Sequence, residues 1–343
     1  MKALVKKARG EGNIDVLDVP VPRPSEDEVL IRVMAAGVCG SDLKIEKDEH
    51  PYYPPVIMGH EFSGIVEAVG SSAKGWRPGD RVVSELHTNR CGTCLHCLTG
   101  EWHVCASKRA PGWGIDGAFA EFIKLPAWLL HKLPDEVSFH EGALMEPLAV
   151  AVHAMLERAR VEVGDYVVIL GCGPVGLLAA QVARAAGARE VLVAGTDSDE
   201  NVRLKAAGEL GFGTVNVQRE DIVSRVMGST GGMGADCVGE FSGAPSAIAQ
   251  AFRMVRIHGR IAAVGVPGPD RVEVAWKENV FKAVDVHFSF SSKYSSWERG
   301  LSLLATQRIH LTPLISRVLP LGEWRTAFDL ARRGDAIKVL LEP

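Results

Sequence analysis

The sequence lacks any apolar run long enough to span a bilayer, and Met1 to Val5 lead into charged residues without the apolar core of a signal peptide. It also lacks a basic block and an acidic tail, since 38 Lys and Arg residues nearly balance 42 Asp and Glu residues. This balance gives no reason to expect nucleic acid or an anionic membrane as a partner. We therefore expect a cytoplasmic protein that binds neither.

No internal repeats or low-complexity segments interrupt the chain, and 47% hydrophobic with 23% charged residues is the composition of a folded protein. At 343 residues the chain exceeds the length over which one hydrophobic core keeps growing, so two domains are expected. Short alternating segments in residues 1–151 predict a mostly β domain with long loops. Alternating strands and helices over residues 152–287 predict a doubly wound parallel sheet. Residues 288–343 are expected to pack back on the β domain.

The chain has seven cysteines, an odd number, and the expected compartment is reducing. Both points argue against a set of disulfides and favour thiolate metal ligands together with buried cysteines that have no chemical role. Four of them follow the spacing C-x2-C-x2-C-x7-C: Cys91, Cys94, Cys97 and Cys105. Four thiolates close a tetrahedron around zinc and leave no position for substrate, so this lobe, about residues 87–108, predicts a structural zinc site. An iron–sulfur cluster is the alternative. Three histidines near the lobe are expected to be solvated loop residues: His87, His96 and His103.

A second metal site is indicated by His60 and Glu61, which stand side by side between Gly59 and Gly64. Neighbours in a regular strand point to opposite faces, so the glycines must bend the backbone if both residues face one ion. The alternative interpretation of this stretch is a surface turn.

Cys39 lies 21 residues before His60 and forms with it a thiolate–imidazole pair that suits zinc, provided that the fold brings two strands together. A lone cysteine is otherwise a buried spectator. Here Ser41 follows it and supplies a hydroxyl that could pass a proton.

A buried strand over residues 164–170 is followed by Gly171-Cys172-Gly173-Pro174-Val175-Gly176 and then by a helical stretch, residues 177–186. G-x-G-x-x-G between a strand and a helix is the dinucleotide-binding fingerprint. Its glycines let the backbone approach a pyrophosphate, which the N–H groups of the helix N-terminus bind. The expected cofactor contacts here and after a later strand are Gly171, Gly173, Pro174, Val175, Gly176, Val264 and Val266.

The residue that selects between NAD and NADP is expected at the end of the next strand, residues 190–194. Gly195 takes the usual place of an acid, and Asp197 follows two residues later. Asp197 would bind the ribose 2′-hydroxyl of NAD, whereas Gly195 and Thr196 would leave room for a 2′-phosphate that Arg203 could meet. We favour NAD because two aspartates make this loop acidic, with NADP as the alternative. The aspartates could also simply cap the following helix.

Together these motifs resemble those of the zinc-dependent medium-chain dehydrogenase/reductase family, the alcohol and polyol dehydrogenases. The resemblance covers essentially the whole chain, in the order Cys39-Gly40-Ser41-Asp42, Gly59-His60-Glu61-x2-Gly64-x5-Gly70-x2-Ala73, the four-cysteine lobe and Gly171 to Gly176. It implies a GroES-like β catalytic domain (1–151), a Rossmann domain (152–287) and a C-terminal segment (288–343) that returns to the catalytic domain. The active site is then expected in the cleft between the domains.

The resemblance also implies that Cys39, His60 and Glu61 surround a catalytic zinc, with Glu146 near it as in sorbitol and threonine dehydrogenases. Zinc would lower the pKa of a substrate hydroxyl, NAD(P) would take up the hydride, and Ser41 would carry the released proton. Four fixed protein ligands would leave zinc no open position. We therefore expect that Glu61 and Glu146 do not both bind it firmly at the same moment.

Two departures from the family pattern leave alternatives open. Lys44 stands where many relatives have a histidine that passes the proton to solvent, so either Lys44 or His50 completes the relay. Some sorbitol dehydrogenases have an Arg-Tyr pair at the place of Ser292 and Lys293, and that pair is missing here. Four residues are candidates for the substrate pocket or for ordinary packing: Trp113, Lys293, Tyr294 and Trp297.

The expected reaction is the reversible oxidation of a secondary alcohol, in a polyol or sugar-like substrate, by NAD(P). L-threonine 3-dehydrogenase activity is the alternative, although the tryptophan-rich sequence associated with it is not evident in residues 42–51. From another class, a zinc-stabilised protein that binds NAD(H) without turnover would have no use for Cys39, Ser41, His60 and Glu146 together. The resemblance suggests a dimer or tetramer formed through the Rossmann domain.

Overall fold

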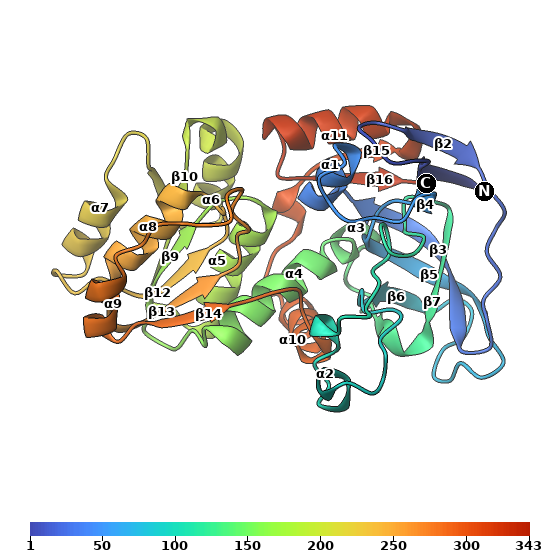
Figure 1. Ribbon diagram of the computed structural model, residues 1–343, viewed down its shortest axis with the longest axis horizontal. Coiled ribbons are helices and arrows are strands. Elements are labelled where there is room, and N and C mark those ends of the chain that lie inside the picture. The colour runs from blue at the N-terminus through green and yellow to red at the C-terminus, as the bar shows by residue number, and fades with distance from the viewer. The chain divides into compact units, whose positions relative to one another are not determined.

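The computed structural model describes all 343 residues and divides into two compact units (Figure 1). The first unit comprises Met1–Glu146, Lys293–Ala305 and Leu311–Pro343, and the second comprises Pro147–Ser292 and Thr306–His310. No helix combines the length and apolar character that a membrane span needs. The functional domains expected at 1–151, 152–287 and 288–343 stay a prediction.

The first unit consists mainly of antiparallel strands arranged around β3, which pairs with β5, β7 and β16. Its larger sheet has the order β15-β16-β3-β5-β6-β8 with β7 beside β3, and β15 with β16 is the parallel pair. A smaller sheet has the order β2-β1-β4. The strands are β1 Lys2–Lys6, β2 Ile14–Asp18, β3 Glu28–Gly37, β4 Val56–Ile57, β5 Glu61–Val69, β6 Arg81–Ser84, β7 Phe122–Pro126, β8 Leu130–Lys132, β15 Ile315–Pro320 and β16 Lys338–Glu342.

The helices of this unit are short, except for α10 and α11 near the C-terminus. Helix α11 buries Trp324, Ala327 and Phe328, an i, i+3, i+4 stripe, and ends before Gly334 at φ +77°. The helical segments are α1 Gly40–Glu46, α2 Leu95–Leu98, η1 Trp102–Val104, η2 Ala127–Leu129, α3 Phe139–Gly142, α10 Tyr294–Ala305, η6 Thr312–Leu314, η7 Leu321–Glu323 and α11 Trp324–Arg333.

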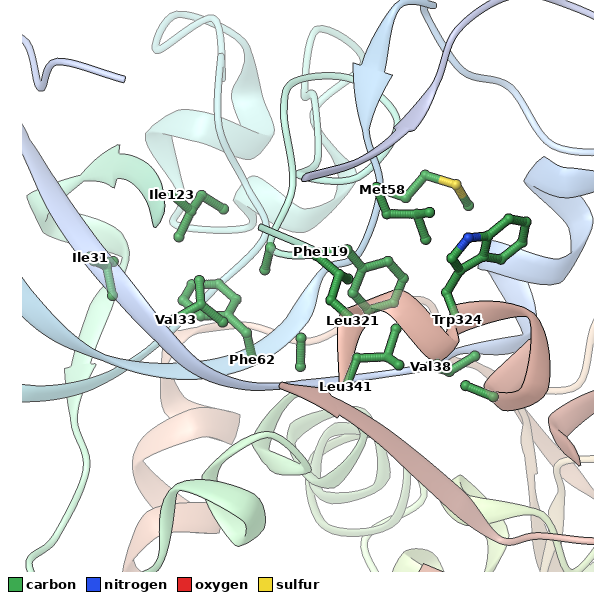
Figure 2. Packing of buried hydrophobic residues seen from close by; sticks show 14 of the residues in the cluster. Ile31, Val33, Val38, Met58, Phe62, Phe119, Ile123, Leu321, Trp324 and Leu341 are labelled. Carbon is green, nitrogen blue, oxygen red and sulfur yellow. The ribbon is translucent and has the colours of Figure 1, made fainter. Parts of the chain in front are cut away.

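The core of the first unit joins residues from both ends of the chain. Figure 2 shows Phe62 of β5 near Val33 of β3, and Phe119 near Leu321. Leu341 of β16 belongs to the same buried cluster. Because β16 also hydrogen-bonds to β3, the C-terminal strand is an integral part of this sheet.

The second unit is a six-stranded parallel sheet with the order β11-β10-β9-β12-β13-β14. This is the classic doubly wound order, and β9 at its centre is buried throughout, as expected for an apolar strand covered on both faces. The strands are β9 Tyr166–Leu170, β10 Glu190–Gly195, β11 Gly213–Asn216, β12 Ala235–Glu240, β13 Val255–Ala263 and β14 Asp285–Phe288. The predicted parallel sheet is thus confirmed.

Helices connect these strands (Figure 1). Helix α5 contacts β9, β10 and β12, whereas α8 contacts β12 and β13. Their bounds are α4 Met145–Val152, η3 His153–Arg158, α5 Pro174–Ala186, η4 Asp197–Asp199, η5 Glu200–Leu204, α6 Lys205–Glu209, α7 Ile222–Ser229, α8 Pro245–Met254 and α9 Trp276–Lys282, with α4 beginning in the first unit.

Candidate metal centres and cofactor turn

The first candidate metal centre forms where β3 ends and β5 begins. Cys39 follows β3 as the N-cap of α1, and the antiparallel register pairs Gly37 with Glu61. Ligand atoms of Cys39, His60 and Glu61 lie within 4.8 Å of one another, and His60 and Glu61 are buried. The fold therefore brings the three residues together as a thiolate, imidazole and carboxylate set that fits zinc.

Two glycines make room for this arrangement. Gly59 has a φ of +88°, and a Cβ added there would lie 2.5 Å from the Phe119 ring. A Cβ at Gly37 would lie 2.4 Å from Oε2 of Glu61. A larger residue at either position would have to displace buried groups beside the candidate ligands.

Asp42 is a site residue that was missing from the expected set. It is fully buried, its Oδ2 accepts the Cys39 N–H at 2.9 Å, and its Oδ1 lies 3.7 Å from Nδ1 of His60. A carboxylate behind a ligating imidazole fixes its tautomer and leaves Nε2 available to a metal. The capping-box spacing from Cys39 to Asp42 at the start of α1 is the signal that could have revealed this role.

The electrostatics of His60 reflect the same neighbours. Burial opposes its positive charge, but the Asp42 carboxylate and the Cys39 sulfur outweigh burial and raise the pKa of His60 well above its usual value. Nε2 of His60 lies 3.5 Å from Oγ of Ser41. The expected proton carrier thus touches the expected ligand.

Glu61 has a partner that the sequence did not reveal. Nζ of Lys338, in β16, donates to Oε2 of Glu61 at 2.6 Å and to the carbonyl of Val38 at 3.0 Å. Both side chains are almost completely buried, at 1% exposed for Glu61 and 3% for Lys338. Burial alone would lower the pKa of Lys338, but Glu61 and the nearby Cys39 raise it above its usual value. The ammonium therefore keeps its charge and holds Glu61.

Glu146, in the first turn of α4, lies outside the group of three residues whose ligand atoms are within 4.8 Å. Burial raises its pKa to about 7, against the opposing charges of His60 and Lys338. The Glu61 carboxylate adds to this rise. Glu146 is thus electrostatically coupled to the centre, and its role as a ligand stays a prediction.

The two candidates for the end of the proton relay differ in their surroundings. Lys44 is exposed on α1. His50 is half-buried, its Nδ1 lies 2.8 Å from the Pro51 carbonyl, and burial lowers its pKa. The Trp113 ring makes edge contacts with both His50, at 5.1 Å between centroids, and His60, at 4.8 Å. Trp113 therefore lies beside the candidate centre.

The second candidate metal centre is the four-cysteine lobe. The ligand atoms of its cysteines lie within 4.8 Å of one another, and Sγ of Cys91 is 3.8 Å from those of both Cys97 and Cys105. Tetrahedral zinc with Zn–S bonds of about 2.3 Å requires sulfurs about 3.8 Å apart, so the lobe fits a structural zinc. None of the seven cysteines forms a disulfide.

Backbone N–H groups prepare one of these sulfurs for metal binding. The amides of Thr93 and Cys94 donate toward Sγ of Cys91 and lower its pKa to about 6. Burial has the opposite effect on Cys97 and raises its pKa to about 12. At neutral pH the lobe is thus part thiolate and part thiol before metal binds.

The interpretation of His87 and His103 as solvated loop residues is wrong, because their exposed fractions are only 1% and 6%. His96 is exposed. Nε2 of His87 lies 3.5 Å from Glu85, a fully buried acid, and Nδ1 of His103 lies 3.5 Å from Glu101. A carboxylate within 3.5 Å offsets part of the cost of burying each imidazole.

Three of the pocket candidates, Lys293 before α10 and Tyr294 and Trp297 on it, lie near His131 or Glu101. His131 stacks on Trp297 at 5.5 Å and contacts Glu85 and Glu298 through its two ring nitrogens, at 3.3 and 2.5 Å. Tyr294 lies 4.8 Å from the His131 ring, and Lys293 pairs with Glu101 at 3.2 Å. A packing role accounts for Trp297, which is 1% exposed.

In the second unit, the glycine-rich turn follows β9 at the point where the strand order reverses. Gly171 has a φ of +97°, and a Cβ at Gly176 would lie 1.9 Å from the Gly171 carbonyl oxygen. Gly173 is the N-cap of α5 and Pro174 its first residue. The turn therefore has the close strand–helix approach and open helix N-terminus that a pyrophosphate needs, and Val175 lies in the first turn of that helix.

The end of β10 shows how its polar residues are engaged. The Asp199 carboxylate accepts a capping hydrogen bond from the Thr196 N–H at 3.0 Å and pairs with Arg203 at 2.9 Å. Asp197 is exposed, and its carboxylate pairs with Arg219 at 2.8 Å. Helix capping is thus the role of Asp199. Arg219 is a charged residue at this edge that the sequence did not single out.

The two valines expected beside the cofactor follow β13. The Val264 N–H donates to the Glu240 carbonyl at 2.9 Å, and Val266 is 74% exposed. Their contact with a cofactor stays a prediction.

Comparison with known proteins agrees with both units. Residues 25–135 match the model of the alcohol dehydrogenase GroES-like domain, and residues 174–306 match the model of the zinc-binding dehydrogenase domain. A sorbitol dehydrogenase from Halalkalibacterium halodurans is 38% identical over 344 residues, covering 100% of this chain and 99% of the relative. An L-threonine 3-dehydrogenase from Bacillus subtilis is 38% identical over 350 residues, with coverage of 100% and 99%.

Among solved structures, a zinc-binding dehydrogenase from Sinorhizobium meliloti bound to NADP has a TM-score of 0.92 and 32% identity, covering 100% of this chain and 99% of that one. These matches extend over the full length and include the metal-binding and cofactor-binding segments. They confirm the expected family, fold class and enzyme class, with zinc and NAD(P) as cofactors for reactions at CH–OH groups. The chain therefore belongs to the zinc-dependent medium-chain dehydrogenases, with a GroES-like domain and a Rossmann-type domain.

Proposed function

We propose that this protein reversibly oxidises a secondary alcohol of a polyol or sugar-like substrate with NAD(P). The observation that carries the proposal is the grouping of the half-buried Cys39 with the buried His60 and Glu61, with Ser41 next to the imidazole. The full-length relative named sorbitol dehydrogenase supports the polyol class.

Within this proposal each residue at the first centre has a distinct role. Cys39 and His60 would hold zinc, which when bound would act as a Lewis acid that lowers the pKa of a substrate hydroxyl. Asp42 orients His60, and Ser41 takes up the hydroxyl proton. Because Lys338 holds Glu61 in a buried ion pair, Glu61 is not a firm ligand while that pair lasts. This supports the expectation that Glu61 and Glu146 do not both bind at once.

The proton then passes to His50 rather than to Lys44. Nδ1 of His50 faces the Pro51 carbonyl, so it carries the hydrogen and leaves Nε2 as the acceptor. The lowered pKa of His50 favours the neutral ring that can accept a proton. An ammonium group such as that of Lys44 has no lone pair to offer. NAD(P), bound at the Gly171–Gly176 turn, supplies the hydride acceptor.

Oxidation of L-threonine is the second candidate function. It is favoured by the relative named L-threonine 3-dehydrogenase, whose identity over the full chain equals that of the sorbitol dehydrogenase. The two candidates share the metal centre and the cofactor, so the substrate alone distinguishes them.

A substrate panel tests the proposal. The zinc-loaded protein is mixed with NAD or NADP and with sorbitol, other hexitols and pentitols, their phosphates, simple secondary alcohols and L-threonine, and the absorbance of reduced nicotinamide is followed. Turnover of a polyol is the expected result, whereas turnover of L-threonine alone would favour the second candidate. If both nucleotides bind but no substrate in the panel reduces either of them, the enzyme proposal is refuted.

Matched variants identify the centre. Cys39→Ser is expected to lose one of two zinc ions together with turnover, whereas Ser41→Ala keeps both ions and loses turnover. His96→Gln, at an exposed histidine of the four-cysteine lobe, serves as the control that keeps both. Retention of full activity by Cys39→Ser would contradict the assignment.

We further infer that the protein works in the cytoplasm as a homo-oligomer joined along β14. This strand is an edge of the parallel sheet, and an open edge can pair with a second copy. Phe288 on β14 and Trp276 and Phe281 on α9 are 77%, 70% and 78% exposed. Exposed aromatic residues beside an open edge are typical of an interface. The absence of disulfides among seven cysteines supports a reducing compartment.

Light scattering tests this assembly. Phe288→Asp is expected to yield a monomer, whereas Met233→Asp, at a similarly exposed apolar side chain in a loop, keeps the assembly. A wild-type monomer would refute the inference.

A further inference from the structure

The acid that normally selects NAD has no counterpart at the end of β10. Gly195 is buried there, and a Cβ added to it would lie 2.6 Å from Sγ of Cys172 and 3.0 Å from Leu204. Sγ of Cys172, in the glycine-rich turn, thus fills the space that a side chain at position 195 would need. Selection between the ribose 2′-hydroxyl and a 2′-phosphate must therefore come from residues further along the chain.

Asp197 is already neutralised. Its Oδ1 accepts hydrogen bonds from Nδ2 of Asn216 at 2.8 Å and lies 2.8 Å from Nε of Arg219. Its own N–H donates to the Gln218 side chain at 2.7 Å. Glu200 accepts from Asn216 at 2.7 Å and lies 3.6 Å from Nη1 of Arg219. The acidic character expected of this loop is thus offset by one guanidinium.

Backbone hydrogen bonds hold Arg219 at the carboxyl edge of the sheet. Asn216 ends β11 and stands beside Gly195 in the parallel register. The Val217 N–H donates to the Gly195 carbonyl at 3.0 Å, and the Arg219 N–H donates to the Asn216 carbonyl at 3.0 Å. In open parallel sheets, ligands bind outside the carboxyl ends of the strands. Arg219 therefore belongs to the edge where the adenosine ribose is expected.

Arg219 and Arg203 differ in how readily each can change partner. The Arg203 side chain is 22% exposed and pairs with Asp199, whose side chain is 12% exposed and caps Thr196. Removing Arg203 would leave a largely buried carboxylate without its cation, which is costly. The Arg219 side chain is 60% exposed and its partner Asp197 is 54% exposed. A solvent-exposed pair is weak and separates easily.

We propose that Arg219 is the residue that admits NADP, by moving from Asp197 and Glu200 to the 2′-phosphate, so that this chain accepts both NAD and NADP. With NAD, Arg219 stays on the two carboxylates and the nucleotide binds without it. With NADP, the doubly charged phosphate forms the stronger charge-assisted pair with the guanidinium. The inference rests on the proposed function only in assuming that the nucleotide binds at the Gly171–Gly176 turn.

The test is direct binding of NADH and NADPH to the zinc-loaded full chain without substrate, followed by nucleotide fluorescence. Wild type is expected to bind both. Arg219→Ala should weaken NADPH about tenfold or more and NADH less than about twofold, and Arg219→Lys should restore part of the NADPH affinity. Asp197→Asn should shift the preference toward NADPH because it releases Arg219. Arg225→Ala is the matched control, since Arg225 is 48% exposed and pairs with Glu220 at 3.1 Å.

Three results would overturn the inference: wild type binding only one of the two nucleotides, Arg219→Ala changing both affinities by the same factor, or Arg225→Ala reproducing its effect. In each case nucleotide binding itself persists and the proposed function stands. Failure of wild type to bind either nucleotide would instead overturn the proposed function and this inference with it.

Discussion

Replacing Lys338 with methionine tests whether a buried cation holds the glutamate of the first metal centre. The substitution keeps most of the apolar stem and removes the ammonium that pairs with Glu61 at 2.6 Å. Glu61 is 1% exposed, so water cannot take the place of the lost partner. The Val38 carbonyl also loses its side-chain donor.

The size of the effect follows from this burial. Removing one partner of a buried ion pair costs about 3–5 kcal/mol, because the remaining charge is left uncompensated. Such a loss corresponds to a fall of about 6–20 °C in the Tm of a unit of this size. Lys124→Met is a matched control, because Lys124 pairs with Glu28 at 2.8 Å but is 38% exposed, and it should cost less than about 1 kcal/mol.

Bound zinc should reduce the loss of stability that Lys338→Met causes. A bound cation gives Glu61 a new partner, so Lys338→Met should be less destabilising in the zinc-loaded protein than in the chelated one. Adding Glu61→Gln to Lys338→Met should recover much of the loss, since both charges are then gone. Urea unfolding of wild type, Glu61→Gln, Lys338→Met and the double variant, each with and without zinc, measures these differences. Equal stability of wild type and Lys338→Met without metal, or simple additivity in the double variant, would refute the reasoning.

Three further predictions concern the metal centres and a buried lysine. Asp42→Asn should lower the zinc affinity of the first centre about 10–100-fold, measured by competition with a chelator, while the four-cysteine lobe keeps its zinc. Because the folded-state pKa of Cys91 is lowered to about 6, its thiolate is present above that pH and is lost as the pH falls through it. Zinc retention by the lobe should therefore weaken more steeply below about pH 6. The pKa of Cys97 is raised, so zinc binding at pH 7 should release a proton, which calorimetry in different buffers would detect. Lys6→Met should destabilise the first unit by about 2–5 kcal/mol in urea unfolding, because Nζ of the fully buried Lys6 binds three backbone carbonyls, those of Gly10 and Gly12 at 2.6 Å and of Glu46 at 3.2 Å.

The features that the sequence predicted well are local in the chain. The four sulfurs of the lobe come from one short segment, so their spacing alone indicates a tetrahedral site. The turn from Gly171 to Gly176 likewise joins consecutive elements, β9 and α5. Apolar runs gave the order of strands and helices in the second unit because each parallel strand is buried on both faces.

The features that the sequence did not reveal depend on distant pairing. Lys338 reaches Glu61 only because β16 pairs with β3 and β3 pairs with β5. His87 is buried because Glu85 and His131, on two different strands or their ends, turn toward the same interior. Neither contact leaves a periodic or spacing signal, so the sequence predicts solvent exposure for His87 and does not reveal Lys338 as a partner of Glu61.

The same contrast distinguishes how the two metal centres are built. In the lobe, backbone amides of the same short segment lower the pKa of Cys91. The first centre instead brings together Asp42 of α1, Glu61 of β5 and Lys338 of β16 with Cys39 and His60, which stand just before α1 and β5. All of these side chains except the half-buried Cys39 are buried. Burying so many ionisable groups is unfavourable for stability unless they pair closely. Local sequence patterns do not predict such buried charged groups, and in this chain they occur at the first metal centre, where we place the reaction.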